Sequence, residues 1–294
     1  MEKVITENRN ENTKDIDVIS TAEVVKKIND EDKLVALAVE KELQNITRAV
    51  DIIVENFKNK GRLFYYGAGT SGRLGVLDAS ECPPTFGVEA DMVQGIIAGG
   101  DSALRYAVEG AEDDYMAGFK DGAILSENDT CVLISASGNP KYLMGVANMA
   151  QQRGAKIIAL TSNPDAKILK VCDVGICIQA GAEPIAGSSR MKSGTAQKMV
   201  LNILSTASMV KIGKTYENYM IDVKATNEKL KQRAISIVSE LAESDEETAL
   251  RALEKTDWKV KPAILMVRND ISYSSANKML EKHGGILRRV LDEQ

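Results

Sequence analysis

The stretch of the chain that most constrains its fold is Arg62–Glu81, where a short apolar run breaks into a glycine-rich turn and then into a helical pattern. The run Leu63–Tyr66 is short, apolar and stopped by glycine, which is typical of a buried strand. In the turn, Gly69 allows a tight backbone path, and the hydroxyls of Thr70 and Ser71 can cap the helix that follows. Because the amides at a helix N-terminus favour anions, this turn suits a bound phosphate.

Two nucleotide-binding motifs are close to this turn but do not fit it. Gly67, Gly69 and Gly72 have the G-x-G-x-x-G spacing of dinucleotide-binding proteins, which is a weak pattern when it stands alone. That motif also expects an acidic residue at the tip of a second strand roughly 20 residues further on, whereas Glu89 and Asp91 fall in a predicted loop. No Gly-Lys-Ser/Thr follows the turn, so a P-loop is disfavoured. The turn alone leaves two interpretations, a helix cap with nothing bound and a phosphate site.

A second unit of the same kind begins at Thr130–Ser135, an apolar run that opens into Ser137 and other small residues before a helix predicted over 142–152. Further strand-like runs cover 93–100, 156–162 and 174–179. Strands that alternate with helices predict an α/β fold with a doubly wound parallel sheet flanked by helices. Ligands of such sheets bind outside the carboxyl ends of the strands, where both hydroxyl-rich turns would lie.

The composition divides the chain into four regions. Residues 1–17 are polar with few apolar anchors, and we expect a mobile arm. Residues 18–58 are predicted to form a helical lead-in, with Ser20 or Thr21 capping a helix over 23–29 and a second helix over 32–58. Residues 59–216 should form the sheet domain. Residues 222–294 should form a small helical region that includes a strand-like or buried run at 263–267.

An acidic run lies on a helix predicted over residues 102–119. It consists of Glu109, Glu112, Asp113 and Asp114. Taken alone, such a run is usually a solvated helix face.

A polar cluster precedes a long helix predicted over 193–211. The cluster contains Glu183, Ser188, Ser189, Arg190 and Lys192. A helix start with exposed charges would explain part of it, but the gathered hydroxyls and cations exceed what a helix cap needs. The cluster therefore predicts contacts with a polar ligand.

Composition disfavours several kinds of partner and cofactor. A formal charge of -5 without a long basic run argues against nucleic acid. No apolar stretch reaches the roughly 18 residues that span a membrane, and the polar N-terminus is unlike a signal peptide, so we expect a cytoplasmic protein. One histidine, His283, and four cysteines without C-x-x-C spacing predict no metal site. Catalysis would then use carboxylates, lysines, hydroxyls and backbone amides.

Four long segments of the chain resemble the N-acetylmuramic acid 6-phosphate etherases, a family of the sugar-isomerase (SIS) domain superfamily. They lie at 67–87, within 97–114, at 134–140 and at 183–198. The resemblance implies cleavage of the D-lactyl ether of N-acetylmuramic acid 6-phosphate to N-acetylglucosamine 6-phosphate and D-lactate, in the recycling of cell-wall amino sugars. It also implies a carbon–oxygen lyase that needs no cofactor and forms a homodimer.

The resemblance assigns the chemistry to two glutamates. Glu81, in the DASEC segment, matches the acid at the lactyl oxygen, and Glu112, in EGAED, matches the base at C2. In the open-chain sugar the C1 aldehyde delocalises the charge that develops when the C2 proton leaves, so one base and one acid suffice. Either Arg190 or Lys192 is a candidate cation for stabilising that charge.

The two hydroxyl-rich turns predict the phosphate contacts. Ser71, Ser135 and Ser137, with Thr70 in support, should hold the 6-phosphate. Two alternatives come from other classes of protein: a sugar-phosphate sensor without turnover, which would not need both glutamates, and an aldose–ketose isomerase of the same superfamily. An assay for released D-lactate distinguishes the etherase from the sensor and from the isomerase.

Overall fold

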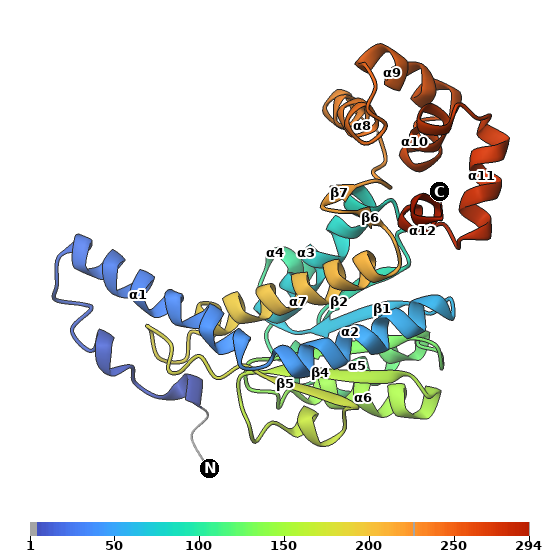
Figure 1. The fold of residues 1–294 in the computed structure, drawn as a ribbon. Helices are drawn as coiled ribbons and strands as arrows, with labels where there is room; N and C mark the ends of the chain where they lie inside the picture. The colour runs from blue at the N-terminus through green and yellow to red at the C-terminus, as the bar shows by residue number, and fades with distance from the viewer. Residues whose placement is uncertain (1–4, 226, 294) are drawn as a thin grey trace. The chain divides into compact units, whose positions relative to one another are not determined.

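The computed structural model describes residues 5–225 and 227–293 and contains a five-stranded parallel sheet (Figure 1). Its strand order is β2-β1-β3-β4-β5. The strands are β1 (Leu63–Gly67), β2 (Val93–Ile97), β3 (Thr130–Ile134), β4 (Lys156–Thr161) and β5 (Val174–Cys177). The predicted doubly wound α/β fold is confirmed, and the chain order reverses direction beside β1, where such folds bind ligands.

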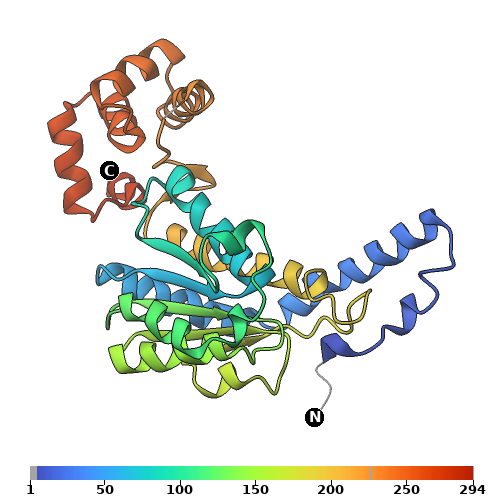
Figure 2. The same ribbon diagram turned by 180° about the vertical axis from the view of Figure 1, so that it is seen from behind.

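Helices cover both faces of this sheet. Helix α2 (Leu43–Lys58) lies on the face toward the viewer in Figure 1. Helix α6 (Lys141–Arg153), with α5 (Tyr115–Asp121) beside it, lies on the face toward the viewer in Figure 2. Every residue of β1 and β3 is buried. A strand covered on both faces needs a continuous apolar run instead of an alternating one, which is the pattern that the sequence has there.

The helical lead-in divides at a different place from the one predicted. Helix α1 (Thr21–Glu40) runs unbroken through the predicted gap near Asn29, and α2 follows after two residues. Ser20 caps α1 in a capping box with Glu23, as expected. The polar residues near the predicted gap do not end the helix because Glu31 is buried there and accepts hydrogen bonds from outside the helix.

Helix α3 (Gly69–Phe86) is longer than predicted at both ends. It begins at Gly69, so Thr70 and Ser71 lie in its first turn and do not precede it. It also continues through Pro83 and Pro84, so the turn expected from Glu81 onward is wrong. Both prolines fall within the last turn of the helix, where they remove two amide donors, and the helix ends soon after them at Phe86.

The helix predicted over 102–119 is wrong, because the chain there forms three short elements: α4 (Ser102–Arg105), η3 (Ala111–Asp113) and α5 (Tyr115–Asp121). Gly110 has a left-handed backbone, with φ of 75°, and Asp114 is extended and accepts a hydrogen bond from the Ala117 amide. An aspartate that caps a new helix cannot continue an old one. Glu112 therefore lies on a single 3-10 turn and not on the face of a long helix.

The described chain forms two compact units, residues up to 80 with 91–208, and residues 81–90 with those from 209 onward. The first unit holds the sheet and has η1 (Ile5–Glu7) and η2 (Glu11–Thr13) near its N-terminus. Most of α7 (Lys192–Lys211) belongs to it, as do η4 (Gly122–Ile124) and η5 (Lys167–Lys170). The domain boundaries and the mobile arm predicted from the sequence stay predictions.

The second unit is helical, with one small hairpin. It contains β6 (Thr215–Tyr216), β7 (Tyr219–Met220), α8 (Glu228–Leu241), α9 (Glu246–Lys255), α10 (Val260–Asn269), α11 (Tyr273–Lys282) and α12 (Leu287–Asp292). Its own core includes Val238, Leu253 and Leu265. The run at 263–267 is part of α10, so its strand-like alternative is wrong. None of the helices in the described ranges has the length and apolar character to cross a membrane.

Candidate active site

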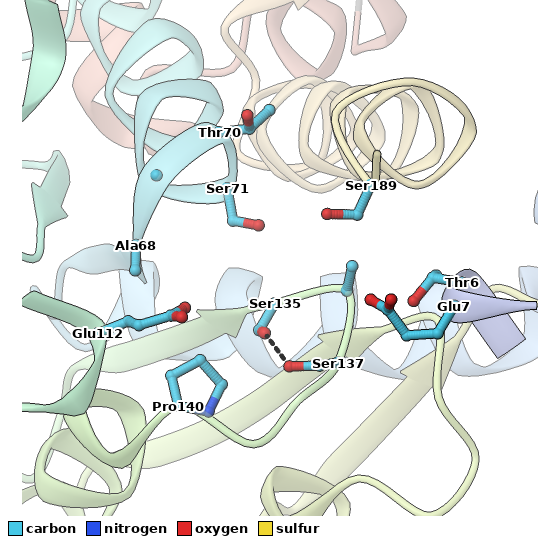
Figure 3. A pocket seen from close by; sticks show the side chains of 12 residues that line it. Thr6, Glu7, Ala68, Thr70, Ser71, Glu112, Ser135, Ser137, Pro140 and Ser189 are labelled. Carbon is cyan, nitrogen blue, oxygen red and sulfur yellow. Dashed lines mark hydrogen bonds between the residues drawn. The ribbon is translucent and has the colours of Figure 1, made fainter. Parts of the chain in front are cut away.

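A pocket of about 300 Å³ opens at the carboxyl ends of β1 and β3 (Figure 3). We call it the hydroxyl pocket, because six of its lining residues carry hydroxyls. It is lined by Thr6, Glu7, Ala68, Gly69, Thr70, Ser71, Glu112, Ser135, Ala136, Ser137, Pro140 and Ser189. All of these residues belong to the first compact unit. The location agrees with the site expected from the two hydroxyl-rich turns.

The two turns meet because their strands are neighbours in the sheet. Gly67 at the end of β1 is paired with Ile134 at the end of β3. The turn after β1 needs glycine for close approach, since a Cβ on Gly67 would lie 2.6 Å from the Gly72 amide nitrogen. The turn after β3 needs glycine for its backbone, since Gly138 has φ of +66°. Both turns therefore fold tightly enough to present their amides and hydroxyls at one place.

The serines after β3 are held by their own turn. Ser135 Oγ accepts a hydrogen bond from the Gly138 amide at 3.0 Å and lies 3.4 Å from Ser137 Oγ. The Ser135 amide donates to the Leu160 carbonyl at 3.0 Å, which fixes this residue to the sheet. The hydroxyl pocket thus has pre-positioned hydroxyls, a property that lowers the entropy cost of binding a ligand.

Ser71 is positioned from α7 by Gln197. Ser71 Oγ donates to Gln197 Oε1 at 2.9 Å, and the Gln197 side chain is buried, with its Nε2 lacking a partner among the described residues. Because amide oxygen and nitrogen are assigned from such networks, turning the amide over lets Nε2 donate to Ser71 Oγ. The Ser71 hydroxyl hydrogen is then available to a ligand.

Two carboxylates face the hydroxyl pocket from opposite sides, with the serine hydroxyls between them (Figure 3). Glu112 comes from η3, and Glu7 comes from η1. Glu7 is held there because the Thr6 carbonyl accepts a hydrogen bond from the Gly187 amide at 2.8 Å. The sequence did not predict Thr6 and Glu7 as pocket residues. They belong to a polar segment without hydrophobic periodicity, and nothing in such a segment indicates that it lines a pocket.

The charge of the hydroxyl pocket is unusual for an anion site. Among its lining residues there is no lysine, arginine or histidine. Hydroxyls, backbone amides and the N-terminus of α3 are the groups that remain to neutralise an anion there. These groups act at short range and in fixed directions, so they favour a ligand of one shape over anions in general.

A second pocket of about 170 Å³ adjoins the first, since Ala68, Gly69 and Glu112 line both. We call it the arginine pocket. Its other lining residues are Arg73, Ala98, Ala103, Tyr106, Ala107, Val108, Glu109, Gly110 and Ala111. Arg73 is the one basic side chain in the described lining of either pocket.

Two proteins with similar sequences have the same name. A Clostridium botulinum (strain Okra) protein is 52% identical over 295 residues, covering 100% of this chain and 98% of its own, and is an N-acetylmuramic acid 6-phosphate etherase. A Vibrio atlanticus protein of the same name is 51% identical over 98% of this chain and 95% of its own. This chain belongs to the N-acetylmuramic acid 6-phosphate etherase family. It is therefore an enzyme of the carbon–oxygen lyase type.

Domain families agree with the fold of this etherase-family chain. Residues 45–150 match the N-terminal SIS domain of glucokinase regulatory protein, 111–207 match the SIS domain, and 217–272 match the C-terminal lid domain of glucokinase regulatory protein. A solved Bacteroides fragilis structure, a candidate phosphosugar isomerase involved in capsule formation, aligns with a TM-score of 0.52 at 23% identity, covering 68% of this chain and 95% of that one. That likeness supports the fold alone.

Glu81, the acid implied by the etherase resemblance, is exposed on α3. It follows Ser71 further along the same helix and is not among the residues that line the hydroxyl pocket. Its catalytic role stays a prediction that rests on the motif around it.

Glu183 and Lys192 of the etherase-like polar cluster are buried, and neither lines the hydroxyl pocket. The two carboxylate oxygens of Glu183 accept the amides of Lys192 and Ser193 at 2.8 and 2.9 Å, which caps α7. Lys192 Nζ lies 2.6 Å from Glu31 Oε2, with both side chains at most 4% exposed. Burial opposes the charge on Glu31, but hydrogen bonds from Asn12 and Lys192 outweigh it and lower the pKa of Glu31.

The remaining members of the cluster are nearer the surface. Ser189 lines the hydroxyl pocket, Ser188 is half-buried beside it, and Arg190 is exposed. Their contacts with a ligand stay predictions. Because the Lys192 ammonium is already paired, Arg190 is the member of the cluster whose cation is accessible.

Proposed function

We propose that this protein cleaves the D-lactyl ether of N-acetylmuramic acid 6-phosphate, with N-acetylglucosamine 6-phosphate and D-lactate as products. The observation that carries the proposal is Glu112 on the wall of a hydroxyl-lined pocket, in a chain that belongs to the etherase family along its whole length. A base beside an anion cradle is the arrangement that a proton abstraction from a sugar phosphate requires.

The 6-phosphate binds in the turns after β1 and β3. Ser71, Ser135 and Ser137 supply hydroxyl donors there, and the first turn of α3 supplies amides and the positive end of its dipole. Thr70 lines the same pocket. Anchoring the phosphate fixes the remote end of the sugar, so that binding energy positions the reacting carbons.

Glu112 acts as the base at C2 of the open-chain sugar. Removal of the C2 proton places charge on the C1 carbonyl oxygen, and the bond from C3 to the ether oxygen then breaks. Among the residues of the polar cluster, Arg190 is better suited than Lys192 to stabilise that oxygen, because the Lys192 ammonium is paired with Glu31.

Glu81 acts as the acid that protonates the departing ether oxygen, which leaves as the hydroxyl of D-lactate. The other product of this step is an unsaturated aldehyde with a double bond between C2 and C3. Water then adds at C3 and a proton returns to C2, so that the net change is the addition of one water molecule across the ether. The assignment of Glu81 rests on its DASEC motif.

The enzyme works in the cytoplasm, in amino-sugar recycling, as a homodimer. The superfamily resemblance supports the homodimer. Its mass in solution, measured by light scattering, should be twice that of the 31.9 kDa chain. A monomer would contradict this part of the proposal.

One assay tests the reaction. Purified protein is incubated with N-acetylmuramic acid 6-phosphate, and D-lactate is measured with a coupled dehydrogenase. Release of D-lactate together with N-acetylglucosamine 6-phosphate is expected. Binding without release, or isomerisation of the sugar without release, would overturn the proposal.

A further inference from the structure

The arginine pocket contains a cation, Arg73, to which the proposed reaction assigns no role. It adjoins the hydroxyl pocket, and Glu112 is on the wall between the two. The substrate of the proposed reaction is anionic at two ends, the phosphate on C6 and the carboxylate of the lactyl arm on C3. The hydroxyl pocket accounts for one anion, and the other needs a partner.

Arg73 is fixed in place by two backbone carbonyls. Its Nε donates to the Leu104 carbonyl at 3.0 Å, and its Nη2 donates to the Tyr106 carbonyl at 3.3 Å. A guanidinium has five N–H donors, and these bonds use two of them. The remaining donors of Arg73 have no protein partner among the described residues, so they are available to an acceptor that enters the arginine pocket.

We propose that the arginine pocket is the subsite for the lactyl arm of the substrate, with Arg73 as the residue that binds its carboxylate. The inference rests on the proposed function and deepens it. A guanidinium matches a carboxylate in shape and charge, and anchoring it by two carbonyls removes much of the rotamer entropy that an arginine loses on binding.

The place of Glu112 agrees with this assignment. The base acts at C2, and the ether oxygen is on the adjacent carbon, C3. A sugar whose phosphate end occupies the hydroxyl pocket and whose C2 faces Glu112 therefore directs its C3 substituent across the shared wall into the arginine pocket. The arm is short and carries one methyl group, which the alanines of the pocket, Ala103 and Ala107 among them, can contact.

The arginine pocket also has two acidic side chains. Glu109 and Glu112 both line it, and each would repel a carboxylate. Arg73 is the side chain in its described lining whose charge offsets that repulsion. The alternative is a purely structural role, in which Arg73 only links α3 to the segment after β2. An experiment must distinguish this role from binding of the lactyl carboxylate.

The experiment compares two ligands that differ in the arm. N-acetylmuramic acid 6-phosphate has the lactyl group, and N-acetylglucosamine 6-phosphate does not. Their dissociation constants are measured by calorimetry for the wild type, for Arg73→Gln and for a matched control, Arg105→Gln, which changes an exposed arginine on α4 that lines neither pocket. Substrate binding is measured in the Glu112→Gln background, so that turnover does not intervene.

For Arg73→Gln we expect affinity for N-acetylmuramic acid 6-phosphate to fall by about 10- to 100-fold, the usual effect of losing a charge-assisted hydrogen bond. Affinity for N-acetylglucosamine 6-phosphate should stay within about twofold of the wild type, because that ligand has no lactyl carboxylate for Arg73 to bind. Arg105→Gln should change neither. An equal loss for both ligands would overturn the subsite, since a structural role weakens both together.

Two further results keep the inference testable on its own. If Arg73→Gln does not fold, Arg73→Lys is measured in the same way, and a selective loss of several-fold for the lactyl ligand is expected, because lysine lacks the guanidinium fork. If the wild type releases no D-lactate, the proposed reaction fails. The subsite then still requires the wild type to prefer the lactyl ligand and Arg73→Gln to lose that preference.

Discussion

The two adjoining pockets differ in the groups that can neutralise a bound anion. The hydroxyl pocket is built mainly from turns at the ends of two strands and has no basic side chain in its described lining. The arginine pocket is built from the start of α3 and the segment after β2, and it has one basic side chain. Fixed amides and hydroxyls suit a phosphate because they surround it from several directions. A guanidinium matches a single carboxylate in shape and in charge.

The difference also reflects how each pocket is positioned. Hydrogen bonds in the sheet and in the β3 turn fix Ser135, so the hydroxyl pocket follows from the fold itself. Arg73 depends on carbonyls of a loop that α4 and η3 interrupt. We therefore expect the hydroxyl pocket to be shared among SIS folds and the arginine pocket to be specific to substrates that carry an acidic arm.

The largest expected effect is the loss of stability on changing Lys192, a residue that lines neither pocket. Removing one partner of a buried ion pair leaves the other charge unpaired, so Lys192→Met should lower the free energy of unfolding by about 3–5 kcal/mol in urea titrations. The double variant Lys192→Met with Glu31→Leu should recover much of that loss. A raised KM at unchanged stability would show that Lys192 contacts the ligand. The ligand site would then include a second cation, and the contrast between a pocket without a basic side chain and a pocket with one would no longer hold.

The next largest effect is the loss of turnover on changing Glu112, which lines both pockets. Glu112→Gln keeps the size of the side chain but cannot take a proton, so kcat should fall by at least about 100-fold in the D-lactate assay. The dissociation constant for N-acetylglucosamine 6-phosphate should change little. Turnover close to that of the wild type would remove Glu112 from the reaction.

A loss of similar size is expected for Glu81→Gln, because protonation of the ether oxygen requires an acid, and removing it should lower kcat by at least about 100-fold. The side chain is exposed and outside the hydroxyl pocket, so thermal stability should be that of the wild type. Full activity in this variant would show that the DASEC motif has another role and that the acid is elsewhere.

A smaller effect is expected in the hydroxyl pocket itself. Ser135→Ala removes one hydroxyl donor, and KM should rise about tenfold with a smaller change in kcat. Ser236→Ala, which changes an exposed serine on α8 that lines neither pocket, is the matched control and should behave as the wild type. If the wild type cleaves N-acetylmuramic acid as well as its 6-phosphate, the phosphate assignment of this pocket is wrong.

The smallest effect is expected at Glu109 in the arginine pocket. Glu109→Gln removes a negative charge near the lactyl carboxylate, so KM should fall slightly and kcat should stay within about twofold of the wild type. This variant is also the control for Glu112→Gln, because it makes the same change on the same loop. A loss of turnover as large as that expected for Glu112 would transfer the role of base to Glu109.

Local patterns in the sequence predicted most of the sheet and of the hydroxyl pocket. Buried parallel strands need continuous apolar runs, and tight strand-to-helix turns need glycine, so β1, β3 and their turns were identified together with Ser71, Ser135 and Ser137. Helix ends were predicted less well. Asp114 caps the helix that follows it, and α3 continues through two prolines. Hydrophobic periodicity reports neither feature.

The fold class, the two hydroxyl-rich turns and the etherase motifs follow from the amino-acid sequence, because each depends on a run of neighbouring residues. Three other features appear only in the folded chain: Glu7 lines the hydroxyl pocket, Lys192 pairs with Glu31, and Arg73 lines a second pocket. These arrangements depend on hydrogen bonds and ion pairs between segments far apart in the chain. Such contacts leave no local pattern, since each partner alone reads as an ordinary polar surface residue.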